Sequence, residues 1–153
     1  MKISLILAVC LALSPACARS AEPDRPIHEQ AAPSTMAFTP TKQLKKYYSK
    51  TVNDYVKTES KKSGSFVVHD DVLKKDWNLK MVRVHTDRIV ELGNNEFFAC
   101  ADLKDAGAKT PLDLDFYVKK DGDSWVMQKV LVHKVAGKPR YTYNDKNEMV
   151  PVQ

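Results

Sequence analysis

The spacing of apolar residues changes at Gly64, and this change restricts the possible folds more than any other feature of the sequence. Before Gly64, apolar residues recur every three or four positions, as they do on one face of a helix. They are Leu44, Tyr47, Tyr48, Val52, Tyr55 and Val56. Thr39-Pro40 offers a helix start, with threonine as the N-cap, and Ser63-Gly64 offers an end. The pattern predicts one amphipathic helix over about residues 40–62.

After Gly64 the apolar and polar residues alternate, which is the pattern of half-buried strands. The expected strands cover residues 65–69, 77–92 with a bend near Asp87, 96–103, 112–118, 124–135 and 140–143. Turn residues separate them, at Asp70-Asp71, Gly93-Asn94-Asn95, Asp121-Gly122 and Gly137-Lys138-Pro139. A helix must bury its apolar face against another layer. We therefore expect an α+β domain, with the N-terminal helix packed on a curved antiparallel sheet of about five to six strands.

This order of one helix followed by antiparallel strands resembles the cystatin and NTF2-like architectures, in which a helix lies on a curled sheet. The resemblance covers about residues 40–143. It is a resemblance of layout, because the chain carries neither a cystatin-type inhibitory loop nor an NTF2-like catalytic set. It implies a fold, and a fold alone does not assign a function.

Residues 1–18 have the three parts of a secretory signal peptide. Lys2 gives the positive start, Ile3–Leu13 is apolar but too short to span a bilayer, and Ala16-Cys17-Ala18 supplies small residues for cleavage after Ala18. An alternative is a lipoprotein signal in which Cys17 is lipidated and anchors the chain. We expect a periplasmic or secreted protein with no transmembrane segment once the signal is removed.

The remaining chain divides by composition. Residues 19–38 are rich in proline and polar residues and are expected to be a disordered leader, residues 39–144 a single domain, and residues 145–153 a polar tail. Removing residues 1–18 takes away one charge, Lys2, and lowers the formal net charge from +5 to +4. This mild basic excess favours an envelope protein or an anionic ligand as the partner, and export disfavours nucleic acid.

Strand alternation also sorts polar residues onto one face of the expected sheet. If the strands form a meander, the polar rows of neighbouring strands share the face that the helix does not cover. These rows contain His85, Cys100, Asp102, Asp113, Asp115 and His133. Cys100 is the one cysteine beyond the signal, so no intrachain disulfide is expected in the mature chain.

Imidazole, thiolate and carboxylate groups are the ligands that zinc and copper take in proteins. The candidate metal ligands are His85, Cys100, Asp102, Asp115 and His133. The same groups suit acid–base chemistry if a carboxylate holds His85. The simpler alternative is a solvated sheet face, with Cys100 packed in the core and no cofactor bound.

No enzyme motif stands out, so the first expectation is a non-enzymatic binding or accessory protein whose open sheet face contacts a ligand or a protein. The side chains expected on that surface are Arg83, Asp87, Asp113, Tyr117, Arg140 and Tyr141. One alternative is a metal-binding protein. Another is a small enzyme on an NTF2-like cone, which requires a cavity of several hundred Å³ that contains a histidine–carboxylate pair.

Overall fold

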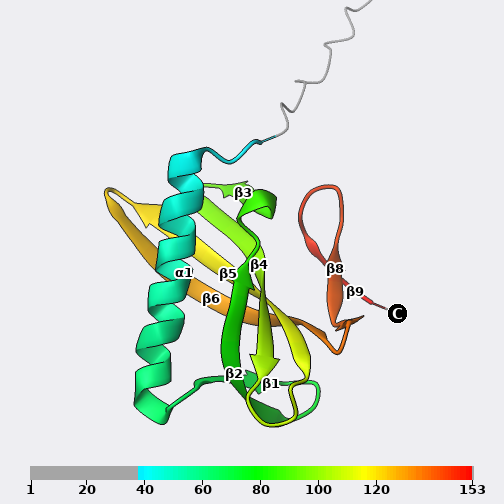
Figure 1. Ribbon diagram of the computed structural model, residues 1–153. Helices are drawn as coiled ribbons and strands as arrows, with labels where there is room; N and C mark the ends of the chain where they lie inside the picture. Colours follow the sequence, from blue (N-terminus) through cyan, green and yellow to red (C-terminus); the bar gives the residue numbers. More distant parts are fainter. Residues whose placement is uncertain (1–37, 153) are drawn as a thin grey trace, which may run out of the picture. The chain divides into compact units, whose positions relative to one another are not determined.

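The computed structural model describes residues 38–152, so the expected signal peptide and the expected leader up to residue 37 lie outside the described residues. The described chain forms one helix, a curled antiparallel sheet and a small C-terminal hairpin (Figure 1). The helix α1 is Lys42–Ser63, and a short 3-10 turn, η1, is Thr86–Arg88. The strands are β1 (Phe66–Asp70), β2 (Lys75–Val84), β3 (Val90–Gly93), β4 (Glu96–Asp105), β5 (Pro111–Asp121), β6 (Ser124–Val135), β7 (Lys138–Pro139), β8 (Tyr141–Tyr143) and β9 (Met149–Pro151).

The helix α1 begins two residues later than the sequence suggests. Thr41, not Thr39, is the N-cap: its backbone is extended, and its Oγ1 accepts a hydrogen bond of 3.2 Å from the amide of Leu44. Thr41 offers the same hydroxyl acceptor as Thr39, and it stands directly before the first residue with helical backbone. The C-terminal end is as predicted, because Gly64 takes the left-handed conformation with φ of 78°.

Replacing Thr41 by alanine removes the acceptor for the Leu44 amide and leaves that group to solvent. We expect the free energy of unfolding to fall by about 1 kcal/mol, measured by urea denaturation. Thr41→Ser keeps the hydroxyl and is the matched control, with an expected change of a few tenths of a kcal/mol. Equal stability of the alanine and serine variants would show that this cap contributes nothing.

The main sheet is an antiparallel meander, as the turn spacing predicts. Its strand order is β1-β2-β4-β5-β6-β7, and β3 pairs with β4 beside this path. One long strand with a bend near Asp87 is expected over residues 77–92. In the structure, η1 interrupts the chain at that point and separates β2 from β3. The sheet curls around α1, which lies across one of its faces (Figure 1).

The core fills the space between α1 and the sheet. The helix contributes Tyr48, Val52 and Val56, all buried. The strands contribute Phe66, Trp77, Leu79, Phe97, Ala99, Ala101, Leu103, Leu112, Leu114, Phe116 and Val118. On β5 the buried apolar residues alternate with polar ones over Leu112–Val118, so β5 presents a polar row to the opposite face.

That opposite face is not open along its whole length, contrary to the expectation. Met149–Pro151, part of the expected polar tail, forms β9 and pairs with β8. The β8–β9 hairpin lies beside the sheet on the side away from α1 (Figure 1). It is held there by tyrosine hydroxyls that bond to β5, as described below. Across residues 38–152, no helix combines the length and the apolar character that a membrane crossing requires.

Candidate metal centre

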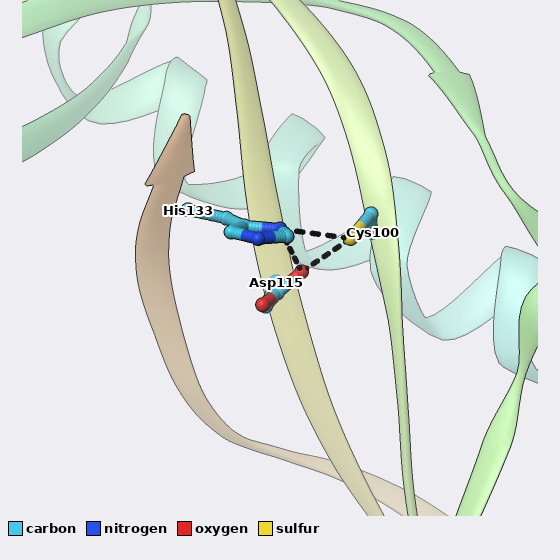
Figure 2. A group of neighbouring side chains, drawn as sticks. All are labelled: Cys100, Asp115 and His133. Carbon is cyan, nitrogen blue, oxygen red and sulfur yellow. Dashed lines mark hydrogen bonds and ion pairs between the residues drawn. The ribbon is translucent and has the colours of Figure 1, made fainter. Parts of the chain in front are cut away.

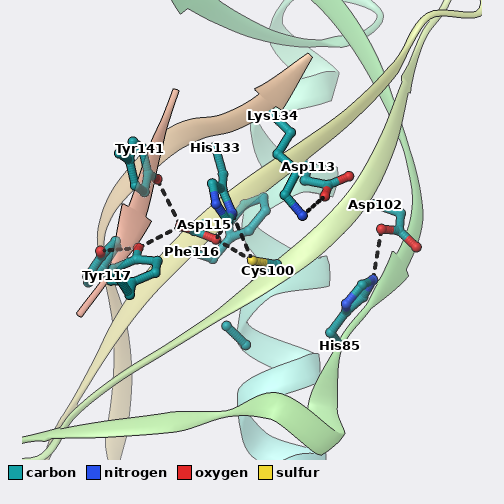
Figure 3. A network of polar contacts seen from close by, with 12 residues as sticks. His85, Cys100, Asp102, Asp113, Asp115, Phe116, Tyr117, His133, Lys134 and Tyr141 are labelled. Carbon is teal, nitrogen blue, oxygen red and sulfur yellow. Dashed lines mark hydrogen bonds and ion pairs between the residues drawn. The ribbon is translucent and has the colours of Figure 1, made fainter. Parts of the chain in front are cut away.

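Four polar side chains form a row across four segments of the face that α1 does not cover. Cys100 of β4 and Asp115 of β5 are register partners. His85 follows β2, and its backbone N–H bonds to the carbonyl of Cys100 at 3.0 Å. His133 of β6 lies on the far side of Asp115 (Figure 3). We call these residues the ligand row: His85, Cys100, Asp115 and His133.

A β-bulge in β6 shapes the end of the ligand row. Asp113 pairs with Lys134 and Leu114 pairs with Val132, so His133 is an extra residue on β6. A bulge places two successive residues opposite one and re-aims their side chains. Lys134 therefore reaches the polar face as His133 does, and its Nζ lies 3.2 Å from the carboxylate of Asp113. Strict alternation assigns Lys134 to the core face, which is why the sequence did not indicate it.

Three members of the ligand row converge to contact distance (Figure 2). The Sγ of Cys100 lies 2.6 Å from Oδ1 of Asp115 and 3.3 Å from Nδ1 of His133. The same Nδ1 lies 3.5 Å from Oδ1 of Asp115. Within residues 38–152, this is the one group of three or more such side chains whose ligand atoms come this close together. We call it the Cys–Asp–His cluster.

Tyrosines from the hairpin fix the orientation of Asp115. Its Oδ1 faces the Cys–Asp–His cluster, whereas its Oδ2 accepts hydrogen bonds from Tyr141 at 2.8 Å and from Tyr143 at 2.6 Å. The ring of His133 stacks on Tyr141, with ring centroids 4.9 Å apart. Asp115 is fully buried, so these contacts supply the partners that a buried carboxylate requires.

The pKa values of the carboxylate and the thiol in the cluster are shifted in opposite directions. Burial by itself raises the pKa of Asp115, but hydrogen bonds from His133, Cys100 and Tyr143 outweigh it and hold that pKa below its usual range. Burial and the neighbouring Asp115 raise the pKa of the Cys100 thiol. In the protein without an ion, Cys100 is therefore a thiol that donates a hydrogen bond to an ionised Asp115.

The fourth member of the row, His85, is held by Asp102. Its Nε2 lies 2.8 Å from Oδ1 of Asp102, and the other oxygen of that carboxylate accepts a hydrogen bond of 2.9 Å from Arg83. A cavity of about 200 Å³ adjoins both His85 and the cluster. Its wall includes His85, Cys100 and His133. Three of the five candidate ligands thus line one cavity. Asp115 is buried in contact with two of them, Cys100 and His133, and Asp102 pairs with the third, His85.

Asp87 does not share the face of His85, although alternation along one continuous strand predicts that it does. The turn η1 interrupts the strand after Val84, and Asp87 instead points to α1. There its Oδ1 lies 2.5 Å from Nζ of Lys45, which lowers the pKa of the exposed Asp87 carboxyl. This side chain lies away from the Cys–Asp–His cluster.

Three other side chains expected on an exposed binding surface are engaged inside the molecule. Tyr117 is buried, and its hydroxyl lies 2.8 Å from that of Tyr143. Arg140 forms a half-buried ion pair with Asp70 at 2.9 Å. Tyr141 bonds to the carboxylate of the cluster. These three residues anchor the hairpin region to the sheet, whereas Arg83 and Asp113 remain at the polar face in ion pairs.

The cluster combines sulfur, oxygen and nitrogen donors beside a cavity, which is a donor set that a transition metal ion accepts. The tyrosines around Asp115 act as the outer-shell contacts that orient metal ligands in known sites. Comparisons with known protein families, with curated proteins and with solved structures gave no match.

Proposed function

We propose that this protein binds a transition metal ion, with Zn²⁺ as the first candidate and copper as the second, through Cys100, Asp115 and His133. The observation that carries the proposal is the convergence of three different ligand atoms within 3.5 Å of one another at a largely buried position. A solvated sheet face, the simpler alternative, does not fit a fully buried Asp115 and a buried His133.

The distances support the proposal. With zinc–sulfur bonds of about 2.3 Å and zinc–nitrogen bonds of about 2.0 Å, tetrahedral ligand atoms lie roughly 3.3 to 3.6 Å apart. The distances from Nδ1 of His133 to Sγ of Cys100 and to Oδ1 of Asp115, 3.3 and 3.5 Å, fall in that range. The third distance, from Sγ of Cys100 to Oδ1 of Asp115, is 2.6 Å and lies below that range; the thiol proton lies between these two atoms, which must move apart for both to bind one ion. Metal binding displaces that proton and removes the reason for the short contact.

The mixed donor set favours zinc. Zinc sites in proteins combine cysteine, histidine and carboxylate ligands, whereas copper(I) favours thiolate and thioether sulfur. The expected signal peptide supports an exported location, and the absence of an enzyme motif supports a binding or accessory role in the envelope. The metal ion is thus the bound partner that the binding or accessory role requires.

Nucleophilic catalysis by Cys100 is the weaker alternative. A cysteine nucleophile acts as a thiolate, and a cationic neighbour usually lowers its pKa. Here burial and the carboxylate of Asp115 raise the pKa of Cys100 instead. The adjoining cavity, about 200 Å³, is also smaller than a typical pocket for an organic substrate.

The test is metal analysis of the protein purified without a histidine tag or a chelator. We expect close to one zinc per chain after incubation with Zn²⁺, and an affinity about 100-fold lower or worse in Cys100→Ser and His133→Ala. His69→Ala is the matched control, because His69 is an exposed histidine of β1 outside the cluster. A wild-type protein that retains neither zinc nor copper would refute the proposal.

A further inference from the structure

We infer that His85 is the fourth protein ligand of this site, and that it reaches the ion by turning its side chain away from Asp102. This inference rests on the proposed function, in which the other three members of the ligand row bind the metal. It makes the site a closed centre with two imidazoles, one thiolate and one carboxylate.

The backbone places His85 beside Cys100. Arg83 pairs with Asp102 and Val84 pairs with Ala101, so the next residues along, His85 and Cys100, are neighbours across the two segments. The hydrogen bond from the His85 amide to the Cys100 carbonyl, 3.0 Å, confirms this pairing. Paired residues on antiparallel segments share a face, with their Cβ atoms about 4.5–5.5 Å apart. An imidazole at this position is long enough to reach an ion held by Cys100.

The cavity lies between the two histidines. Its wall includes His85 from one side and His133 from the other, with Cys100 between them. The volume, about 200 Å³, leaves room for an imidazole ring to turn inward. Figure 3 shows the His85 ring directed toward Asp102, which lies two residues farther along β4 than Cys100 and on the same face.

The contact that His85 gives up is reached by solvent, and the group it leaves stays paired. The side chains of His85 and Asp102 are 19% and 31% exposed, so water can take the place of the imidazole at the carboxylate. After His85 turns, Asp102 keeps its hydrogen bond of 2.9 Å from Arg83. No buried carboxylate is therefore stranded by the movement.

The number of protein ligands decides the kind of site. Zinc held by three protein ligands keeps a water for catalysis, whereas zinc held by four is closed and structural. With His85 bound, the ion has no open position, and the protein holds or stores the metal without reacting through it. The fourth ligand thus connects the geometry to the binding role.

The experiment titrates Co²⁺, a spectroscopic substitute for Zn²⁺, into the wild type and into His85→Ala. We expect the wild type to give the intense visible bands of four-coordinate cobalt, and His85→Ala to bind about 100-fold more weakly or worse. Free imidazole should restore the wild-type spectrum in His85→Ala, because it fills the position of the missing ligand. His69→Ala is the control, because His69 makes a similar pair with Asp76 at 2.7 Å and should titrate like the wild type.

A second variant separates a ligand from a supporting residue. If His85 must leave Asp102 to bind the ion, Asp102→Ala removes a competitor and should tighten Co²⁺ binding several-fold. If His85 instead keeps its bond to Asp102 while the ion is bound, whether it binds the ion through its other ring nitrogen or stays outside the coordination sphere, Asp102→Ala should weaken binding about 10- to 100-fold. That weakening, or a failure of imidazole to restore the spectrum, overturns the inference.

The remaining outcomes distinguish this inference from the proposed function. Equal affinity in His85→Ala and the wild type leaves a three-ligand site and overturns the role of His85. A wild-type protein that binds neither Co²⁺ nor Zn²⁺ removes the proposed function, and the inference falls with it.

Discussion

Asp70→Ala should lower the free energy of unfolding by about 3 kcal/mol, a larger loss than at any exposed acidic residue of the chain. Asp70 is almost completely buried at the end of β1. Its Oδ2 accepts hydrogen bonds from Arg140 at 2.9 Å and from the indole of Trp77 at 3.1 Å. Its Oδ1 accepts from the amides of Val72 and Leu73. Alanine leaves the half-buried guanidinium of Arg140 without its counter-charge, and that loss dominates the cost.

Urea denaturation of Asp70→Ala measures this cost, and Asp71→Ala is the matched control. Asp71 is the next residue, its side chain is 91% exposed, and its contact with His69 is long, 3.8 Å. Its loss should change stability by no more than about 0.5 kcal/mol. Similar small losses in both variants would mean that the Asp70–Arg140 pair adds nothing to the fold.

Asp70 also predicts a particular dependence of stability on pH. Burial raises its pKa, but the hydrogen bonds from Trp77, Leu73 and Val72 and the charge of Arg140 outweigh burial and hold the pKa below its usual value. The unfolded chain therefore binds a proton at a higher pH than the folded chain does. The contribution of Asp70 to the free energy of unfolding is present above about pH 4. It is lost as the pH falls through the pKa that Asp70 has in the folded chain. Asp70→Asn should flatten the fall in unfolding free energy below about pH 4.

Much of the fold could be predicted because two periodicities meet at Gly64. The helical spacing before it and the alternation after it each fix which side chains face the core, so the layered arrangement follows. The exact helix start could not be predicted, because Thr39 and Thr41 both offer a capping hydroxyl and the choice depends on the backbone. The strand β9 could not be predicted either, since a short exposed segment such as Met149–Pro151 becomes a strand only when a partner is present.

The candidate site was predictable where alternation holds. Cys100, Asp115 and His133 lie on the face that their position in the strands indicates, and the meander brings them together. The exceptions arise where alternation breaks: the bulge in β6 adds Lys134 to this face, and η1 removes Asp87 from it. Neither a bulge nor a single 3-10 turn has a sequence signal strong enough to be read in advance.

The tyrosine contacts of Asp115 could not be predicted from the sequence, for a different reason. Tyr141 and Tyr143 alternate on β8 with Thr142 between them, which indicates only that both tyrosines face the same way. Their contact with Asp115 depends on where the hairpin folds back, and the half-buried ion pair between Arg140 and Asp70 holds the chain directly before β8. Long-range ion pairs of this kind leave no local pattern.

Tyr48→Phe should lower the free energy of unfolding by about 2–4 kcal/mol, although it removes a single oxygen atom. The Tyr48 hydroxyl is buried beneath the sheet and sits between β4 and β5. It accepts a hydrogen bond of 2.7 Å from the amide of Ala99 and donates one of 2.6 Å to the carbonyl of Phe116. Phenylalanine leaves a buried amide and a buried carbonyl without partners, and each such group costs about 1–3 kcal/mol.

The same substitution should weaken metal binding about 10-fold or more, because Ala99 and Phe116 are the residues next to Cys100 and Asp115. The hydroxyl thus helps to set the spacing of the two strands under the proposed ligands. Tyr47→Phe is the control: Tyr47 is 41% exposed, and its loss of a hydroxyl should change stability by about 0.5 kcal/mol or less and leave Co²⁺ affinity unchanged. If Tyr48→Phe matches Tyr47→Phe in both measurements, the two strands close on each other without help from the helix, and α1 has no part in positioning the site.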